Sequence, residues 1–409
     1  MMNIDIRQVV LAIGSAVDLV GVDDVLHGRR VAVMAVECAR RLGWDEEKQS
    51  LLFDAGILHD CGVSSTRVHR SLVTQLDWEG SQEHCDKGYR LLKDFAPLAH
   101  IAPIVRYHHT HWEDLTAAEL TPMTARFANL IYLADRVDVN AAPHYADNSL
   151  LLNVGEIRDL IDRHRGAFFA PDLVDAFLAA SRSEAFWLVL DADFIPQYVA
   201  DMGCISRKLT INLDELKRFA LIIADIVDAK SHFTTAHSLG VARLSRALAG
   251  MAGITGESLD LIEVAALFHD IGKLQIPDEV LESPAKLTAA ERALMKRHSF
   301  ATYQILRRIG GFEELARWAS EHHESPRGDG YPFHLLGTEI ALESRIIKVA
   351  DIFQALAQDR PYRGPVPAHE ILAFLRSLET QNEVDPTLVG LVASHLDECY
   401  EAAVGRELD

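Results

Sequence analysis

The chain has 409 residues, of which 49% are hydrophobic, 24% charged and 7% aromatic. It is therefore long enough for two or three domains and lacks the composition of a disordered, collagen-like or low-complexity protein. Its net charge of −20 argues against a basic surface for nucleic acid or an anionic membrane. The sequence predicts a soluble globular protein, with no DNA or RNA polymer and no membrane as a partner.

Apolar residues in two long segments recur at the spacing of amphipathic helices. The pattern runs from Ile6 to Val20 and again from Leu213 to Val227. Segments ending in GILHD and ALFHD predict apolar helices whose last turn carries the His-Asp pair, with Gly62 and Gly272 as helix stops. No succession of alternating strands and hairpin turns appears, so the expected fold class is all-α.

The sequence shows neither a targeting segment nor a membrane span. The first residues, MMNIDIRQVV, lack a basic region followed by an apolar one. The best apolar stretch, from Phe219 to Val227, is interrupted by Asp225. Five scattered cysteines without a CxxC pair fit a reducing compartment. A cytoplasmic location is therefore expected.

The second half of the chain repeats the first, most clearly in its histidines and aspartates. The repeat holds at offsets of 210, 214 and 216 residues. It predicts two tandem helical domains, 1–205 and 206–409, with a boundary where Pro196, Gly203 and the polar RKLT stretch interrupt the apolar pattern. The matched pairs are His27 and His237, His59 and His269, Asp60 and Asp270, His84 and His298, His108 and His322, His109 and His323, and Asp135 and Asp351.

Each repeated set combines five histidines with two aspartates, which is too rich for one tetrahedral ion. Neutral imidazoles and carboxylates suit divalent transition metals such as Fe, Mn or Zn. Two ions about 3.5–4 Å apart can polarise a phosphoryl group, as in two-metal phosphoesterases. The pattern predicts a two-metal centre in the second copy, bridged by Asp270, and a metal site in the first.

The motifs of the second copy closely resemble those of the HD-GYP branch of the HD phosphohydrolase superfamily. They are ALFHDIGKLQIP, KRHS, HHESPRGDGYP and VADIFQALAQDRPYR. The resemblance implies an all-helical domain whose two metals hydrolyse a cyclic dinucleotide to a linear dinucleotide and sometimes to mononucleotide. The usual substrate in the family is cyclic di-GMP, and some members prefer cyclic GMP-AMP. In the family the GYP loop is associated with docking of diguanylate cyclase domains, so the resemblance implies such domains as partners.

The resemblance also assigns roles to residues of the second copy. Two divalent transition metal ions, with Fe or Mn expected, would share Asp270. Asp270 and Lys273 would act in catalysis, with the lysine ammonium holding a substrate phosphate. One metal would be held by His237, His269, Asp270 and Asp351, and the other by His298, His322 and His323. The substrate contacts implied are Lys273, Gly330, Tyr331, Arg360 and Arg363.

Three positions depart from the family pattern. Phe233 stands where some relatives have a glutamate for a third metal, which favours two metals. Gln354 replaces an aspartate often found after the last metal ligand, and Arg327 replaces one before the signature glycines. The last two replacements bear on substrate preference rather than on the chemistry.

The first copy keeps the whole ligand pattern and resembles a general HD phosphohydrolase. Val63 replaces the lysine, and HHTHWEDL contains no GYP loop, so a cyclic-dinucleotide site of the second type is not expected there. Asp23 is either an additional ligand or a helix-entry residue. Three roles stay open for this domain: a phosphohydrolase for a smaller phosphate ester, a sensor that keeps metal without turnover, and a scaffold.

Taken together, these patterns predict a metal-dependent cyclic-dinucleotide phosphodiesterase. The alternative is a receptor that binds the dinucleotide with little turnover and signals through partner contacts at Gly330, Tyr331 and Pro332. The intact ligand set favours the enzyme.

Overall fold

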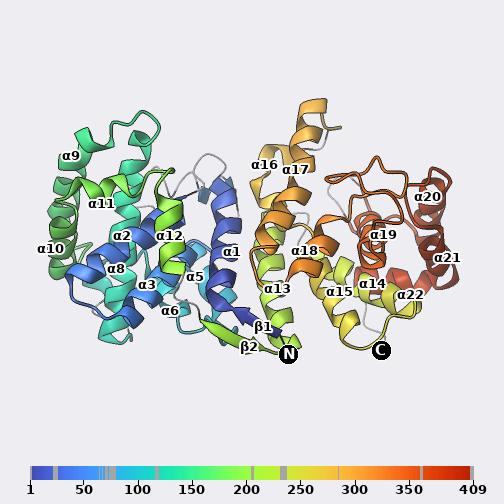
Figure 1. The fold of residues 1–409 in the computed structure, drawn as a ribbon, viewed down its shortest axis with the longest axis horizontal. Coiled ribbons are helices and arrows are strands. Elements are labelled where there is room, and N and C mark those ends of the chain that lie inside the picture. Colours follow the sequence, from blue (N-terminus) through green and yellow to red (C-terminus); the bar gives the residue numbers. More distant parts are fainter. Residues whose placement is uncertain are drawn as a thin grey trace. The chain divides into compact units, whose positions relative to one another are not determined.

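The computed structural model describes residues 2–21, 26–63, 65–66, 68–69, 72, 80–115, 119–203, 207–230, 237–283, 285–359 and 363–405. The chain divides into two compact units. The N-terminal unit is Asp5–Leu209, and the C-terminal unit is Met1–Ile4 together with Thr210–Asp409. Both units are helical, which confirms the all-α prediction (Figure 1). No helix in the described ranges is long and apolar enough to cross a membrane.

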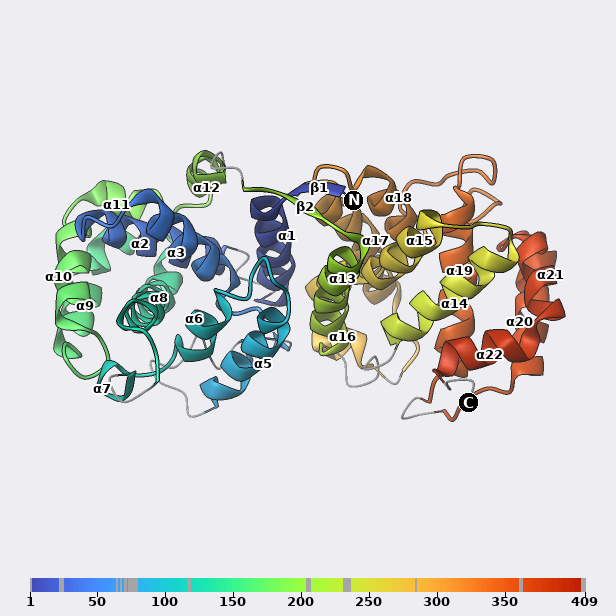
Figure 2. The ribbon, with the colours of Figure 1, turned by 90° about the horizontal axis from the view of Figure 1, so that it is seen from below.

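The N-terminal unit is built around one central helix, α8. This helix is buried along most of its length and packs against α2, α3, α6, α9 and α10 (Figure 2). The helices of the unit are α1 (Ile6–Asp18), α2 (His27–Arg41), α3 (Glu46–Leu58), α5 (Ser81–Lys93), α6 (Ala102–Tyr107), α7 (Trp112–Leu115), α8 (Pro122–Ala141), α9 (Leu150–Arg163), α10 (Pro171–Ala180), α11 (Glu184–Leu188) and α12 (Ile195–Gly203), with 3₁₀ turns η1 (Leu19–Gly21) and η2 (Ala142–His144).

The C-terminal unit has a corresponding central helix, α19. It packs against α14, α15, α18, α20, α21 and α22 (Figure 1). The helices of this unit are α13 (Leu213–Asp228), α14 (His237–Met251), α15 (Glu257–Phe268), the 3₁₀ helix η3 (Ile271–Gln275), α16 (Asp278–Leu281), α17 (Ala289–Leu306), α18 (Glu313–Ser320), α19 (Leu342–Ala357), α20 (Ala368–Thr380), α21 (Pro386–Ser394) and α22 (Leu396–Val404).

Two short strands, β1 (Met2–Asp5) and β2 (Lys208–Ile211), pair in a two-stranded sheet. The Asp5 carboxylate strengthens this pairing, since its Oδ1 accepts from the backbone N–H of Arg207 at 3.1 Å. The sequence analysis missed the strands because four residues carry too little alternation to distinguish a strand from a loop.

The two amphipathic helices predicted from periodicity are present. The predicted segment from Leu213 to Val227 corresponds to α13, which begins with a capping box between Asn212 and Glu215. The segment from Ile6 to Val20 corresponds to α1 followed by the η1 turn. The apolar faces of both helices are buried. This burial explains why apolar residues recur every three or four positions, and why that spacing predicted the helices correctly.

A buried ion pair joins α1 to α3 in the N-terminal unit. Nη1 of Arg7 lies 3.0 Å from Oδ1 of Asp54, and the two side chains are 1% and 0% exposed. Arg7 also donates from Nη2 to the hydroxyl of Ser50 at 2.5 Å. Burial raises the pKa of Asp54 to about 6, although Arg7 opposes the rise. The Asp54 carboxyl is therefore ionised at neutral pH and takes up a proton in mild acid.

Replacing Arg7 by methionine should destabilise the N-terminal unit by about 3 kcal/mol at neutral pH, because a buried carboxylate loses its nearest cation and keeps only Arg207, 3.4 Å away. The pKa of Asp54 in the folded state lies above its ordinary value, so protonation favours folding. The loss in Arg7→Met should therefore shrink as the pH falls from about 7 to about 5. Urea unfolding at both pH values measures the effect. Arg40→Met, which removes an exposed pair with Glu37, is the control, and a loss no larger than the control's would contradict the prediction.

Candidate metal centres

The repeated histidines and aspartates lie at matching places in the two units. His27 and His237 are the first residues of α2 and α14. His59 and His269 directly follow the last residues of α3 and α15. The central helices α8 and α19 each carry the last aspartate of the set. Helix ends and the central helix of each unit thus converge on one cluster of side chains.

In the C-terminal unit the seven predicted ligands come together. Asp270 lies between two groups of histidines, with its Oδ2 3.2 Å from Nε2 of His269 and its Oδ1 3.6 Å from Nε2 of His298. A carboxylate in this position can face two ions at once. Three overlapping groups have ligand atoms within 4.8 Å of one another: His237, His269 and Asp351; His269, Asp270 and His322; and His298, His322 and His323.

A recurring hydrogen bond aims the imidazoles at the centre of each cluster. In His269, His298 and His322, Nδ1 donates to a backbone carbonyl three residues earlier at 2.7 Å. His59 and His108 make the same bond in the N-terminal unit, at 2.8 and 2.6 Å. Because a carbonyl can only accept, Nδ1 carries a proton and Nε2 is the nitrogen that faces the cluster.

The protonation states in the C-terminal cluster suit a metal site. Burial lowers the pKa of His298 to about 4 and that of His322 to about 3, so both rings are neutral. Burial alone would raise the pKa of Asp270, but the positive charges of His269 and Lys273 bring it well below its ordinary value. Neutral imidazoles and ionised carboxylates are the forms that bind divalent metals.

Some buried ligand atoms of both clusters lie 3.2–3.6 Å from a neighbouring histidine or aspartate but make no well-directed hydrogen bond. They are Nε2 of His269 and Oδ1 of Asp270 in the C-terminal unit, and Nε2 of His59 and Oδ1 of Asp60 in the N-terminal unit. Buried polar atoms are almost always hydrogen-bonded, and leaving one unpaired costs about 1–3 kcal/mol. A cation at each centre would satisfy all four atoms, so both clusters fit divalent metal ions.

The glycines after the two His-Asp pairs do not stop helices, contrary to the prediction. The helices already end one residue before each pair, and neither glycine has the left-handed backbone typical of a helix stop. A Cβ on Gly272 would lie 2.0 Å from the carbonyl oxygen of His298, and a Cβ on Gly62 would lie 2.0 Å from that of His84. Each glycine instead allows two ligand-bearing segments to approach closely.

Gly272→Ala should therefore push α17 away from the turn that carries His269 and Asp270. We expect the C-terminal unit to lose about 1–3 kcal/mol of stability, as overpacked sites do, and catalytic turnover to fall with it. Thermal unfolding and a turnover assay measure the two effects. Gly250→Ala is the matched control, because a Cβ there meets nothing within 4 Å. Equal stability and turnover in the two variants would show that the close approach is unimportant.

Lys273 lies at the edge of the C-terminal cluster, where the resemblance implied it. It is on η3, and its Nζ is 2.5 Å from Oδ2 of Asp270. Its side chain is 23% exposed, so the ammonium can reach a ligand that enters from solvent. At the matching position of the N-terminal unit, Val63 is buried and offers no charge.

The loop from Gly328 to Pro332 is held beside the cluster by Glu324, which the sequence analysis overlooked. The buried Glu324 carboxylate accepts from two backbone N–H groups just beyond the loop, at 2.6 and 3.0 Å. The ring of Tyr331 stacks on His323 with centroids 4.7 Å apart. A Cβ on Gly330 would lie 2.4 Å from a backbone nitrogen, so the loop needs glycine there. The acidic residue directly after the paired histidines was the available signal.

Three further residues from the sequence analysis cannot be placed, and Arg363 contacts the backbone of its own unit. Arg360, Asp23 and Phe233 lie outside the described residues. Arg363 donates from Nη2 to two backbone carbonyls near the end of α19, at 2.9 and 3.5 Å. Both bonds use Nη2, and the role of Arg363 at the substrate stays a prediction.

The N-terminal unit brings its seven predicted ligands together in a similar way. Asp60 is again central, with Oδ1 3.2 Å from Nε2 of His84 and Oδ2 3.5 Å from Nε2 of His59. Nε2 of His27 lies 3.4 Å from Oδ1 of Asp135. The groups with ligand atoms within 4.8 Å of one another are Asp60, His84, His108 and His109, and His27, His59 and Asp135.

The two centres differ in the side chain that contacts Nδ1 of the first histidine of each set, His27 or His237. In the N-terminal unit the Nδ1 of that histidine contacts Asp138 at 2.8 Å, and in the C-terminal unit it contacts Gln354 at 2.5 Å. Asp138 also accepts from Nε and Nη2 of Arg30, at 2.7 and 3.0 Å. The position that matches Arg30 at an offset of 210 is Gly240. A neutral amide and a glycine therefore replace a buried charged pair.

Two buried aspartates that the sequence analysis missed, Asp18 and Asp228, support the helices that begin with a ligand. Asp18 accepts from the backbone N–H of Gly28 at 3.4 Å, and Asp228 accepts from the hydroxyl of Ser238 at 2.8 Å. Each bond ties down the first turn of α2 or α14. The signal was present in the sequence, since the two aspartates share the offset of 210 residues.

Comparisons with known proteins agree with this architecture. Two family models, each described as HD domain, match residues 25–140 and 221–388. A relative from Vibrio cholerae named 3'3'-cGAMP-specific phosphodiesterase 1 is 35% identical over 417 residues, which cover 99% of this chain and 95% of the relative. A cyclic di-GMP phosphodiesterase from Thermotoga maritima is 35% identical over 170 residues, which cover 40% of this chain and 46% of the relative.

One solved structure has a similar fold over nearly the whole chain. It is the crystal structure of a cyclic GMP-AMP specific phosphodiesterase of V. cholerae, with a TM-score of 0.66 and 24% sequence identity. The match covers 97% of this chain and 98% of that protein.

Proposed function

The chain belongs to the HD domain family, and on this premise we propose that it is a metal-dependent phosphodiesterase of cyclic dinucleotides. The reaction is assigned to the C-terminal unit, on cyclic di-GMP or 3',3'-cyclic GMP-AMP, with a linear dinucleotide as the first product. The observation that carries the proposal is the buried cluster around Asp270 with the Lys273 ammonium at its edge. A cytoplasmic location is part of the proposal.

The donor set indicates how the metals are held. Divalent ions, with Fe or Mn expected, would supply Lewis acidity at the phosphoryl group and activate water. Asp270 would be shared between two ions. One ion would be held by His237, His269, Asp270 and Asp351, and the other by His298, His322 and His323.

The chain's own residues would bind and orient the substrate. Lys273 provides a cation for a phosphate oxygen, which offsets the repulsion that a protein of net charge −20 exerts on a dinucleotide. Burial of the cluster strengthens this attraction, because water does not screen it fully. The Tyr331 ring beside His323 forms one wall of the site.

For the N-terminal unit we propose a metal centre that does not hydrolyse cyclic dinucleotides. Val63 offers no cation for a phosphate. The Asp135 carboxylate is already engaged by the buried Arg136, whose Nε and Nη2 lie 3.1 and 2.7 Å from its Oδ2. This engagement leaves Oδ1 of Asp135, which lies 3.4 Å from Nε2 of His27, as the oxygen that would face a metal.

The proposal is tested with the purified full chain. Its metal content is measured, and products of cyclic di-GMP and cyclic GMP-AMP are separated by chromatography. Linear dinucleotide should form, should cease after chelation, and should return when Mn²⁺ or Fe²⁺ is added. Tight dinucleotide binding without turnover in fully metallated protein would instead identify a receptor.

A further inference from the structure

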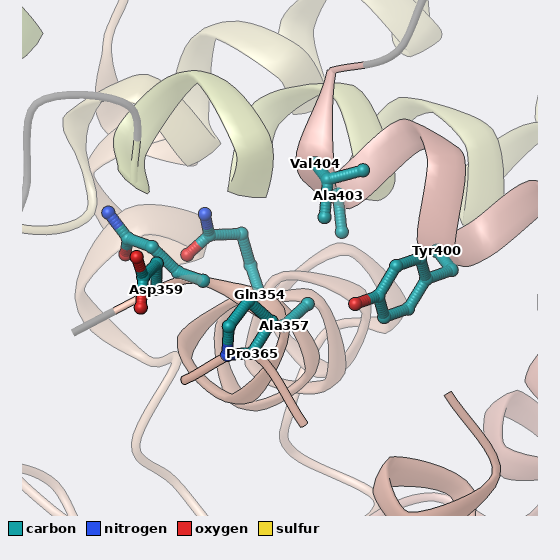
Figure 3. Close-up of a pocket in the computed structure, with 8 residues that line it drawn as sticks. Gln354, Ala357, Asp359, Pro365, Tyr400, Ala403 and Val404 are labelled. Atoms are coloured by element: carbon teal, nitrogen blue, oxygen red, sulfur yellow. The ribbon is translucent and has the colours of Figure 1, made fainter. Parts of the chain in front are cut away.

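A pocket of about 340 Å³ lies at the end of α19 beside α22 (Figure 3). Its polar lining comes from Gln354, Gln358, Asp359 and Tyr400, and small apolar side chains complete the walls. The volume is within the range of about 300–1,000 Å³ typical of small-molecule sites. The pocket offers a planar ligand both apolar walls and hydrogen-bonding groups.

Gly240 allows α14 to pack closely against two residues that line this pocket. A Cβ on Gly240 would lie 2.5 Å from the carbonyl oxygen of Ala403 and 2.7 Å from Cγ of Gln354, and both of these residues line the pocket. The N-terminal unit has Arg30 at the matching position, and its guanidinium donates to Asp138, the counterpart of Gln354. The N-terminal unit thus has a guanidinium–carboxylate pair at the positions where the C-terminal unit has Gly240 and the pocket-lining amide of Gln354.

We propose that this pocket binds a guanine base. Guanine presents two adjacent N–H donors, N1–H and N2–H, beside the O6 acceptor, and the donor pair is the part of the base that resembles a guanidinium. The Asp359 carboxylate can only accept and would receive the two donors. Oε1 of Gln354 contacts Nδ1 of His237, so in the proposed complex the amide nitrogen, which lies beside Gly240, would be the group that donates to O6. Adenine places a ring acceptor beside a single donor, so a carboxylate would disfavour it.

The inference rests on the proposed function and deepens it. A guanine could reach the pocket as one base of the cyclic dinucleotide or as part of a separate nucleotide. In either case Gln354 connects the pocket with His237, which lies on the metal cluster. Guanine binding is therefore coupled to the orientation of a metal-ligand histidine.

Guanosine and adenosine are suitable probes, because they lack a phosphate that metals or Lys273 would hold. Calorimetry on the metal-loaded full chain should show guanosine binding at least about tenfold tighter than adenosine binding, the effect of one good hydrogen-bonded pair. Asp359→Asn should remove that preference. Asp397→Asn, an exposed change on α22 outside the pocket lining, should retain it. Metal content and thermal unfolding of each variant verify that the fold is intact.

Two results would overturn the proposal: equal affinity of the wild-type chain for the two nucleosides, or the same guanosine affinity in Asp359→Asn and Asp397→Asn.

Competitive inhibition of cyclic di-GMP hydrolysis by guanosine would assign the pocket to a base of the substrate. Non-competitive inhibition would assign it to a separate guanine nucleotide. Wild-type hydrolysis of bis(p-nitrophenyl) phosphate, which has no base, tests the metal chemistry independently. Guanosine binding without any phosphodiesterase activity would refute the proposed function alone.

Discussion

Replacing His269 and Asp270 together by alanine is expected to lower kcat/KM for cyclic di-GMP and cyclic GMP-AMP by at least about 1,000-fold, as loss of an essential catalytic unit does. Asp270 lies between the two histidine groups, with one oxygen toward each. Removing it takes away a ligand from both proposed metals at once. Product analysis at matched protein concentration measures the loss.

The N-terminal double variant His59→Ala with Asp60→Ala is the matched control, because these residues occupy the corresponding places in the other unit. It should retain cyclic-dinucleotide turnover and lose only the metal bound by its own unit. Metal analysis of both double variants provides a readout independent of activity. Wild-type turnover in the His269 and Asp270 variant would refute the assignment of the reaction to the C-terminal unit.

The same pair of variants separates the roles left open for the N-terminal unit. If that unit hydrolyses a smaller phosphate ester, turnover of mononucleotides or of the linear product should disappear in the His59 and Asp60 variant alone. A sensor would lose its response to ligand, and a scaffold would lose only thermal stability. Each of the three roles is thus tested by a different measurement on the same variant.

Lys273→Met is expected to lower kcat/KM for cyclic di-GMP by about 100-fold while leaving the metal content unchanged, similar to the loss of one charge-stabilising donor. The ammonium is the cation beside Asp270, and its side chain is partly exposed toward solvent. Methionine keeps the unbranched chain as far as the ε position but removes the ammonium and its charge. Lys273→Arg should recover part of the activity, since it restores a cation in a different shape.

Lys286→Met is the control, because Lys286 is an exposed lysine of the same unit. It should turn over substrate like the wild-type chain. A Lys273→Met variant that matched this control would show that the lysine is a solvated residue near a helix end. A variant that lost its metals would show that the lysine supports the cluster rather than the substrate.

Much of the candidate metal centre could be predicted because its signal is local and repeated. The His-Asp pair, the paired histidines and the last aspartate recur in both halves, and the structure brings each set together. The helices were predictable for a similar reason, since their apolar faces are buried and therefore periodic. The β1 and β2 strands escaped prediction because they are too short to show a period.

The surroundings of the ligands could not be predicted in the same way. Gly272 looked like a helix stop, yet its importance lies in its approach to the carbonyl of His298. The bonds from Arg363 to backbone carbonyls of α19 were likewise not indicated by its place in the sequence. Such roles depend on which segments pack together, and spacing along one segment does not report that packing.

The sequence by itself thus determined the helical class, the repeat and the two sets of metal-type residues, because ligand types and their spacing are properties of the chain. Only the tertiary structure showed which side chains contact and support the ligand histidines. Arg30 and Asp138 are 108 residues apart, and His237 and Gln354 are 117 apart. Contacts at such separations leave no periodic pattern in the sequence. Only the folded structure shows that a buried charged pair, Arg30 and Asp138, supports the N-terminal centre, and that the Gln354 amide beside a pocket supports the C-terminal centre.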